Sequence, residues 1–132
     1  MTKYVIAPAV ALRLAGDRAA IAQEHRLLAP TLLRSQVLSL LYQAVRQGGM
    51  TRAEADLRLD HLRALRIRLL GDRVLQSTAW GIAERLGWPD TLDAEYIALT
   101  RLQADAFITL DRRVARAAEG LVAVAPIEAL TG

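Results

Sequence analysis

Short apolar runs alternate along the chain with longer segments in which apolar residues recur at helical spacing. The apolar runs predict strands at residues 4–6, 26–29, 67–70, 107–110 and 121–125. The clearest helical segment is 31–46, where one face carries Leu33, Val37, Leu40, Leu41 and Ala44. Strands that alternate with helices are typical of a parallel sheet covered on both faces. We therefore predict an α/β fold with a central, mostly parallel sheet.

Capping and helix-breaking residues suggest where the helices begin and end. Pro8 suits the first turn of a helix, and a short helical piece is expected after Asp17. The glycine pair at 48–49 ends the long helix. Thr51 with Glu54 three residues later is a capping-box signature, so another helix is expected to begin there. We expect this helix to turn three leucines inward: Leu57, Leu62 and Leu65.

Length and composition restrict the class of protein. The chain has 132 residues, of which 53% are apolar and 23% charged, so a single globular domain over residues 1–132 is expected. It has no cysteine, which excludes disulfides, thiolate zinc sites and thiol catalysis. No apolar run approaches the ~20 residues of a membrane span, and the N-terminus lacks a signal-peptide layout. We expect a cytoplasmic protein without a membrane partner.

The basic residues are almost all arginine, with Lys3 as the single lysine among 17. The net charge of +3 and the pI near 9.9 point weakly toward a nucleic-acid partner. The scarcity of lysine is more decisive, because a phosphate-binding P-loop needs a Gly-Lys pair and the chain has none. The glycine-rich fingerprint of dinucleotide sites and the GxSxG motif of hydrolases are absent as well.

Two aspartates stand out near the C-terminal end of the chain. Asp93 is expected at the start of a helix, and Asp111 follows the predicted strand 107–110. A helix that leads into a buried strand returns the chain to the same end of a sheet, so these carboxylates, eighteen positions apart (111 − 93), are expected to meet. Paired carboxylates at the carboxyl end of a parallel sheet suit a hard cation such as Mg²⁺.

Four motifs follow one another over nearly the whole length: YVI with AL at 4–6 and 11–12, APTLLRSQV at 29–37, LDAEYIAL at 92–99, and FITLDRR at 107–113. Their order and spacing resemble PIN domains, specifically the VapC-type toxins of bacterial toxin–antitoxin pairs. The resemblance implies a three-layer α/β/α PIN-like domain. It also implies metal-dependent cleavage of RNA, an antitoxin that covers the site, and a homodimer built on the helices.

In that family four acidic residues from separate elements hold Mg²⁺ or Mn²⁺. By resemblance, Asp93 corresponds to the third acid and Asp111 to the fourth, and Thr109 lies beside them as a supporting hydroxyl. This chain departs from the pattern at the other two positions. Ala7 stands where the family has aspartate at the end of the first strand, and Gln36 stands where it has glutamate.

The two departures remove half of the expected charge. Crowded carboxylates repel by ~4 kcal/mol per pair at 4 Å and an effective dielectric near 20, and a divalent cation relieves that repulsion. Losing two of four charges therefore weakens metal binding, although Mg²⁺ is often held by one or two carboxylates plus waters. We expect weak binding of Mg²⁺ or Mn²⁺ at Asp93 and Asp111, Gln36 as a neutral ligand or water holder, and greatly reduced cleavage.

Several interpretations stay open at this stage. The chain is a naturally degenerate domain, a deliberately inactivated form, or a domain in which Asp90 or Glu95 completes the site. A non-enzymatic module that binds RNA or an antitoxin is the alternative to a ribonuclease.

The arginines, the leucines and the two aspartates can each be explained by a structural role as well as by a functional one. Arg112, Arg113 and Arg116 either grip RNA phosphates next to the metal or form a solvated helix face. The leucines at 57, 62 and 65 are the expected place for partner contacts. Asp93 can act through the helix dipole, and Asp111 can cap the helix that follows it.

Overall fold

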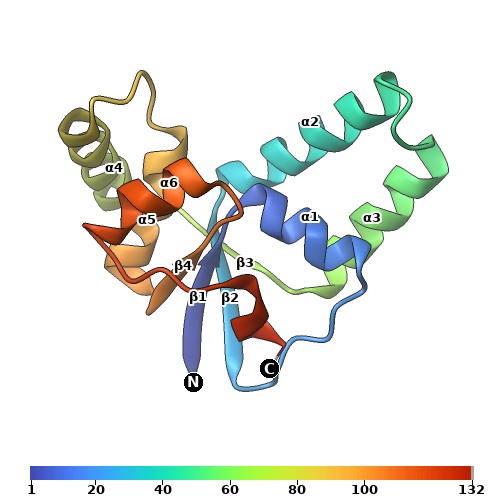
Figure 1. Ribbon diagram of the computed structural model, residues 1–132, viewed down its shortest axis with the longest axis horizontal. Coiled ribbons are helices and arrows are strands. Elements are labelled where there is room, and N and C mark those ends of the chain that lie inside the picture. Colours follow the sequence, from blue (N-terminus) through green and yellow to red (C-terminus); the bar gives the residue numbers. More distant parts are fainter. Residues whose placement is uncertain (132) are drawn as a thin grey trace.

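The computed structural model describes residues 1–131, and its centre is a parallel sheet of four strands in the order β3-β2-β1-β4. Every pair of neighbouring strands is parallel. The sheet consists of β1 (Thr2–Ile6), β2 (His25–Pro30), β3 (Arg68–Leu70) and β4 (Ala106–Ile108). Helices cover both of its faces (Figure 1). The predicted α/β class and parallel sheet are confirmed.

Six α-helices and a short 3₁₀ helix lie within the described chain. They are α1 (Pro8–Gly16), α2 (Leu32–Arg46), α3 (Arg52–Ala64), α4 (Arg73–Leu86), α5 (Leu92–Gln103), α6 (Arg112–Glu119) and η1 (Ile127–Leu130). In Figure 1, α2 and α3 form a hairpin that projects from one side of the sheet, and α4 and α5 pack together on the other side. No helix within residues 1–131 combines the length and apolarity that a membrane span requires.

Local signals in the sequence account for most of these boundaries. Pro8 is at the first position of α1, where its missing N–H costs nothing. The Thr51–Glu54 capping box is formed in both directions, with each N···O distance 3.1 Å. Gly87 ends α4 in a left-handed conformation with φ 68°, which glycine adopts without the strain of a Cβ atom.

The core lies on both faces of β1 and β4, the strands that lead to the candidate site. Val5, Ile6, Phe107 and Ile108 are at most 1% exposed. Ile6 pairs with Ile108 in register, so the two strands end side by side. Tyr96 on α5 packs against Phe107, with ring centroids 6.4 Å apart. The burial of these residues fixes where the chain emerges at the carboxyl edge of the sheet.

Two predicted elements are wrong. Residues 17–24 contain no helix, because the chain there makes only turns on its way to β2. The predicted strand at 121–125 is reduced to a single bridge between Val124 and Phe107. Phe107 donates its N–H to Ala123 and accepts from the N–H of Ala125, both at 2.9 Å. Within the described chain no further bridge to β4 follows, because the backbone turns into η1 at Ile127.

Three details of side-chain placement and strand length also differ from expectation. Leu57 is 51% exposed because α3 buries only Ala55 fully, whereas Leu62 and Leu65 pack against the core as predicted. Leu40 is 40% exposed because α2 projects beyond the sheet (Figure 1). The last strand ends at Ile108 rather than 110, because the following residues form the turn that caps α6.

Candidate functional site

The carboxyl edge of the sheet brings together the residues that follow β1 and β4. Ala7 donates its backbone N–H to the carbonyl of Ile108 at 3.0 Å, so Ala7 and Thr109 leave adjacent strands side by side. This edge is where ligands bind in open parallel α/β sheets. Ala7 and Thr109 are both half-buried here, and Ala7 offers no side-chain donor or acceptor.

Asp111 lies just beyond Thr109 and caps the start of α6. Its Oδ1 accepts the backbone N–H groups of Arg113 at 2.9 Å and Val114 at 3.2 Å. Thr109 supports the same turn, because its Oγ1 accepts the backbone N–H of Asp111 at 3.2 Å. Oδ1 of Asp111 therefore caps the helix, whereas Oδ2 makes no hydrogen bond among the described residues.

Asp93, in the first turn of α5, is close enough to Asp111 for their charges to interact. Burial raises the pKa of the Asp93 carboxyl, and the negative charges of Asp111 and Asp90 raise it further. Arg113 acts in the opposite direction. Two carboxylates that disfavour each other's ionisation are the arrangement that a cation relieves. The charges of Asp93 and Asp111 therefore interact at this edge of the sheet.

Gln36 on α2 reaches the same region, and its amide is held by a tyrosine that sequence reasoning missed. The Tyr96 hydroxyl donates to Oε1 of Gln36 at 2.6 Å. Tyr96 is 1% exposed, and burial raises the pKa of its hydroxyl, so it stays a donor at neutral pH. The bond uses one of the two lone pairs of the amide oxygen, so this uncharged oxygen is only partly available to a cation, and the NH₂ group cannot bind one. Tyr96 lies three residues after Asp93 and looked like an ordinary core residue in an apolar helical run.

The donor set fits only a weakly held cation. Within residues 1–131, no three His, Cys, Asp or Glu side chains gather in a group that could hold a metal ion. Of the two alternative acids, Asp90 is near enough for its charge to raise the pKa of Asp93, and it accepts the N–H of Leu92 at 3.1 Å, whereas Glu95 is half-buried, with its pKa raised by burial alone. The carboxylates of Asp93 and Asp111, completed by waters, would be a minimal ligand set for Mg²⁺ or Mn²⁺.

A group of exposed arginines borders the carboxylates. Arg112, Arg113 and Arg116 project from α6 and, with Ala117, line a shallow cavity of about 430 Å³. None of the three makes an ion pair within the described part of the chain. Positive charge next to the half-buried Asp93 and the exposed Asp111 suits a ligand that carries both phosphate and a bound cation.

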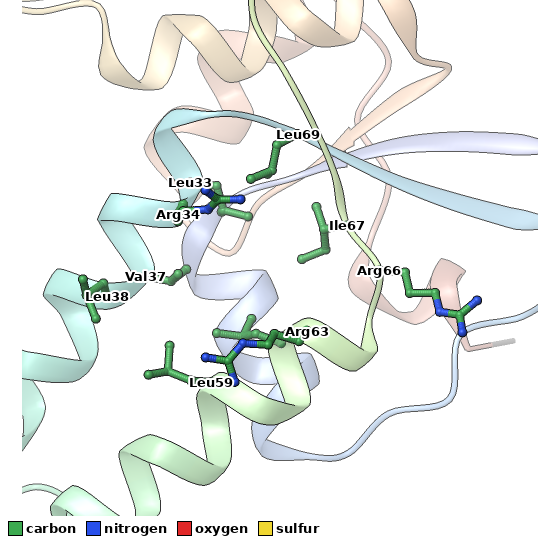
Figure 2. A pocket seen from close by; sticks show the side chains of 10 residues that line it. Leu33, Arg34, Val37, Leu38, Leu59, Arg63, Arg66, Ile67 and Leu69 are labelled. Atoms are coloured by element: carbon green, nitrogen blue, oxygen red, sulfur yellow. The ribbon is translucent and has the colours of Figure 1, made fainter.

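A second hollow lies between α2, α3 and β3, remote from the carboxylates in sequence and formed mainly by apolar side chains. Its volume is about 510 Å³, and Figure 2 shows the side chains that line it. Arg34 and Arg63 border it, and Arg63 is paired with Asp60 at 2.6 Å. The apolar lining is Leu33, Val37, Leu38, Leu59, Leu62, Ile67 and Leu69. Leu62 therefore lines this apolar groove, whereas Leu57 does not.

The strand order, the all-parallel sheet and the helices on both faces define a PIN-like fold. Solved structures with the same fold include PAE2754 from Pyrobaculum aerophilum, at 17% identity and a TM-score of 0.70, covering 97% of this chain and 92% of that one. Another is VapBC2 from Rickettsia felis bound to a DNA fragment from their promoter, at 7% identity and a TM-score of 0.68, covering 94% of this chain and 98% of that one. No protein-family model and no curated protein matches the sequence.

Proposed function

We propose that this chain is a cytoplasmic VapC-like PIN domain whose metal-dependent ribonuclease chemistry is reduced to a weak residual activity. The observation that carries the proposal is the pairing of Asp93 with Asp111 at the carboxyl edge of a PIN-like sheet. Beside that pair, the positions of the other two family acids hold Ala7 and Gln36. The scaffold is thus retained while half of the charge is missing.

The chain's own residues divide the expected chemistry between them. Asp93 and Asp111 would hold Mg²⁺ or Mn²⁺. A bound metal would lower the pKa of a water ligand and offset phosphate charge. Thr109 keeps Asp111 in position through the bond to its N–H. Arg112, Arg113 and Arg116 would bind the phosphates of RNA alongside the metal.

A specific observation favours a second candidate function, an RNA- or antitoxin-binding module without catalysis. The oxygen of Gln36 accepts the Tyr96 hydroxyl at 2.6 Å, so position 36, where the family has an acid, offers only an uncharged oxygen that already accepts one hydrogen bond. The two candidates share the fold and the arginines of α6. They differ in that only the ribonuclease cuts RNA.

The ribonuclease and an RNA-binding module without catalysis both predict that α6 binds RNA phosphates. Arg116→Ala should weaken the binding of a labelled single-stranded RNA and lower the slope of log affinity against log salt by about 0.7, the value for one phosphate contact. Fluorescence anisotropy over a series of salt concentrations measures both. Arg46→Ala is the matched control, because Arg46 is an exposed arginine in the last turn of α2. Equal slopes for the two variants would refute the α6 contact.

The apolar groove between α2 and α3 supports an antitoxin partner. Its lining includes no aromatic side chain on which a base could stack, which argues for a peptide rather than RNA. An amphipathic helix with leucines on one face and glutamates on its flanks would match the apolar lining and the charge of Arg34. We propose a segment of that kind as the part of the antitoxin that binds here.

The groove is tested with a synthetic helical peptide of this design. Leu38→Glu should weaken peptide binding about tenfold or more, because Leu38 lines the groove yet is 57% exposed and tolerates a charge. Leu40→Glu on the same helix lies outside the lining and should leave the affinity unchanged. Titration calorimetry gives both affinities. Peptide binding that neither variant alters would place the partner elsewhere.

A further inference from the structure

A small cavity lies where α1 and α3 end side by side (Figure 1), and neither the carboxylate site nor the groove accounts for it. Its volume is about 210 Å³, and it shares no lining residue with the groove. Since α1 begins at Pro8, beside the carboxyl edge of the sheet, its other end is roughly 12 Å away along the helix axis. We refer to this hollow as the α1–α3 cavity. Its lining consists of Leu14, Ala15, Arg18 and Ala19 around the end of α1, and His61, Ala64 and Leu65 around the end of α3.

Arginine occupies a position in the turn after α1 where glycine is usual. Arg18 donates its backbone N–H to the carbonyl of Ala15 at 3.2 Å, and Ala19 donates to that of Leu14 at 3.0 Å. These two bonds form the Schellman motif that ends many helices, and Arg18 is its left-handed residue, with φ 51°. Glycine adopts that conformation freely, whereas an arginine there strains the backbone. What arginine adds at this position is a positive charge beside the cavity.

Arg58 on α3 brings a second guanidinium to the same end of α1. A Cβ atom on Gly16 would lie 2.9 Å from the Cζ and Nη1 atoms of Arg58, so the guanidinium lies directly against the glycine. Arg58 is half-buried, and His61, three residues later, lies on the same face of α3. Within residues 1–131 this guanidinium has no hydrogen-bond acceptor and no ion pair, which is costly for a half-buried group. The arginines that do make side-chain hydrogen bonds are Arg26, Arg52 and Arg63.

His61 adds a ring nitrogen to the cavity. Its Nδ1 lies 3.1 Å from the carbonyl oxygen of Ala15. Because a carbonyl oxygen only accepts, Nδ1 carries the hydrogen, and Nε2 is left without a hydrogen bond among the described residues. Two negative features oppose an anion here. The end of the α1 dipole amounts to about half a charge, and the carboxylate of Asp17 is exposed, so solvent and salt screen it. The charges of the two guanidinium groups outweigh both.

We propose that the α1–α3 cavity binds a phosphate monoester, held by the guanidinium groups of Arg18 and Arg58 with Nε2 of His61 beside them. A phosphate monoester carries about −1.5 to −2 charges at pH 7, which two arginines balance, and the guanidinium fork matches its oxygens in pairs. Pockets that hold a whole small molecule measure about 300–1,000 Å³, so this smaller cavity suits the phosphate group alone. The phosphate belongs either to a free nucleotide or to the 5′ end of an RNA chain. Neither the carboxylates nor the groove take part, so failure of this proposal would leave the proposed function intact.

Titration calorimetry with adenosine 5′-monophosphate tests the cavity, with adenosine as the ligand that lacks the phosphate. The monophosphate should bind and adenosine should not. Arg58→Gln should weaken binding of the monophosphate about tenfold or more, because it removes one of the two charges. Arg18→Gly should weaken it as much without lowering the midpoint of thermal unfolding, since glycine relieves the strain of the left-handed residue. A purely structural role for Arg18 would leave binding unchanged and would overturn the proposal.

Two arginines outside the cavity provide matched controls. Arg13→Gln removes an exposed charge from the last turn of α1, and Arg116→Ala removes one from α6. Both variants should bind adenosine 5′-monophosphate like the parent chain. A loss in either control as large as that in Arg58→Gln would contradict the assignment of the phosphate to this cavity. The same holds for a parent chain that binds the monophosphate no more tightly than adenosine.

Two RNA oligonucleotides of one sequence, with a 5′-phosphate or a 5′-hydroxyl, distinguish the sources of the phosphate. Tighter binding of the phosphorylated RNA that is lost in Arg18→Gly would identify the end of an RNA chain as the ligand. Equal binding of the two RNAs by a parent chain that binds adenosine 5′-monophosphate would identify a free nucleotide.

Discussion

Restoring the two missing acids, with Ala7→Asp and Gln36→Glu together, is expected to tighten Mn²⁺ binding by about 100-fold. That factor requires ~2.7 kcal/mol, which is less than the ~4 kcal/mol Coulomb energy of one unit-charge pair at 4 Å and an effective dielectric near 20. The added carboxylates would join Asp93 and Asp111, whose charges already repel. Titration calorimetry with MnCl₂ on the parent and the restored chain measures the change.

The two restorations should not contribute equally. A carboxylate at position 36 would continue to accept the Tyr96 hydroxyl, so one of its oxygens is less available to the metal. Ala7→Asp should therefore give the larger gain. Asp93→Asn in the restored chain is the control and should remove most of the binding. Equal affinities for the parent and the restored chain would mean that position 7 and position 36 do not face the metal.

Metal binding should also depend on pH in a direction set by Asp93. Burial and the charge of Asp111 raise the pKa of the Asp93 carboxyl, so protonation begins at a higher pH than for an ordinary aspartate. Since a cation binds the ionised form, affinity should fall as the pH is lowered through that raised pKa. Because bound metal opposes protonation, the protonation of Asp93 should shift toward lower pH in saturating MnCl₂.

Phe107→Ala is expected to lower the free energy of unfolding by about 3–5 kcal/mol. Phe107 is 1% exposed, packs against Tyr96, and pairs its backbone with the segment at Ala123 and Ala125. Removing the ring would leave a cavity next to the strand that delivers Thr109 and Asp111 to the site. Urea denaturation followed by circular dichroism gives the change.

A surface residue two positions beyond the strand provides the comparison. Leu110 is 38% exposed, so Leu110→Ala should cost less than ~1 kcal/mol. If Phe107→Ala costs no more than Leu110→Ala, β4 would not be the strand that organises the core. The position of Asp111 near Asp93 would then need an explanation other than the burial of β4.

The fold could be predicted where the signal was local. The capping box at Thr51 and the proline at the start of α1 act within one helical turn, and both are present as expected. The strand predicted at 121–125 failed for a non-local reason. Its apolar composition is suited to a strand, but the backbone turns into η1 at Ile127 after a single bridge to Phe107, so little of the segment can pair.

The site was predictable to a similar depth. A helix followed by a buried strand returns the chain to the same edge of the sheet, which was enough to predict that the charges of Asp93 and Asp111 interact; their role in binding a metal stays a prediction. The bond between Tyr96 and Gln36 joins residues sixty positions apart and depends on how α2 packs beside α5. No pattern in the sequence distinguishes Tyr96 from a tyrosine that merely fills the core.

The most direct test of a silenced ribonuclease scaffold is RNA cleavage by the parent chain and the restored chain, side by side in Mg²⁺ and in Mn²⁺. We predict that the restored chain cuts a mixed RNA pool at least about 100-fold faster, following its tighter metal binding, and that adding Asp93→Ala abolishes this activity. Equal cleavage by the parent and the restored chain would contradict the assignment of Ala7 and Gln36 as the missing ligands.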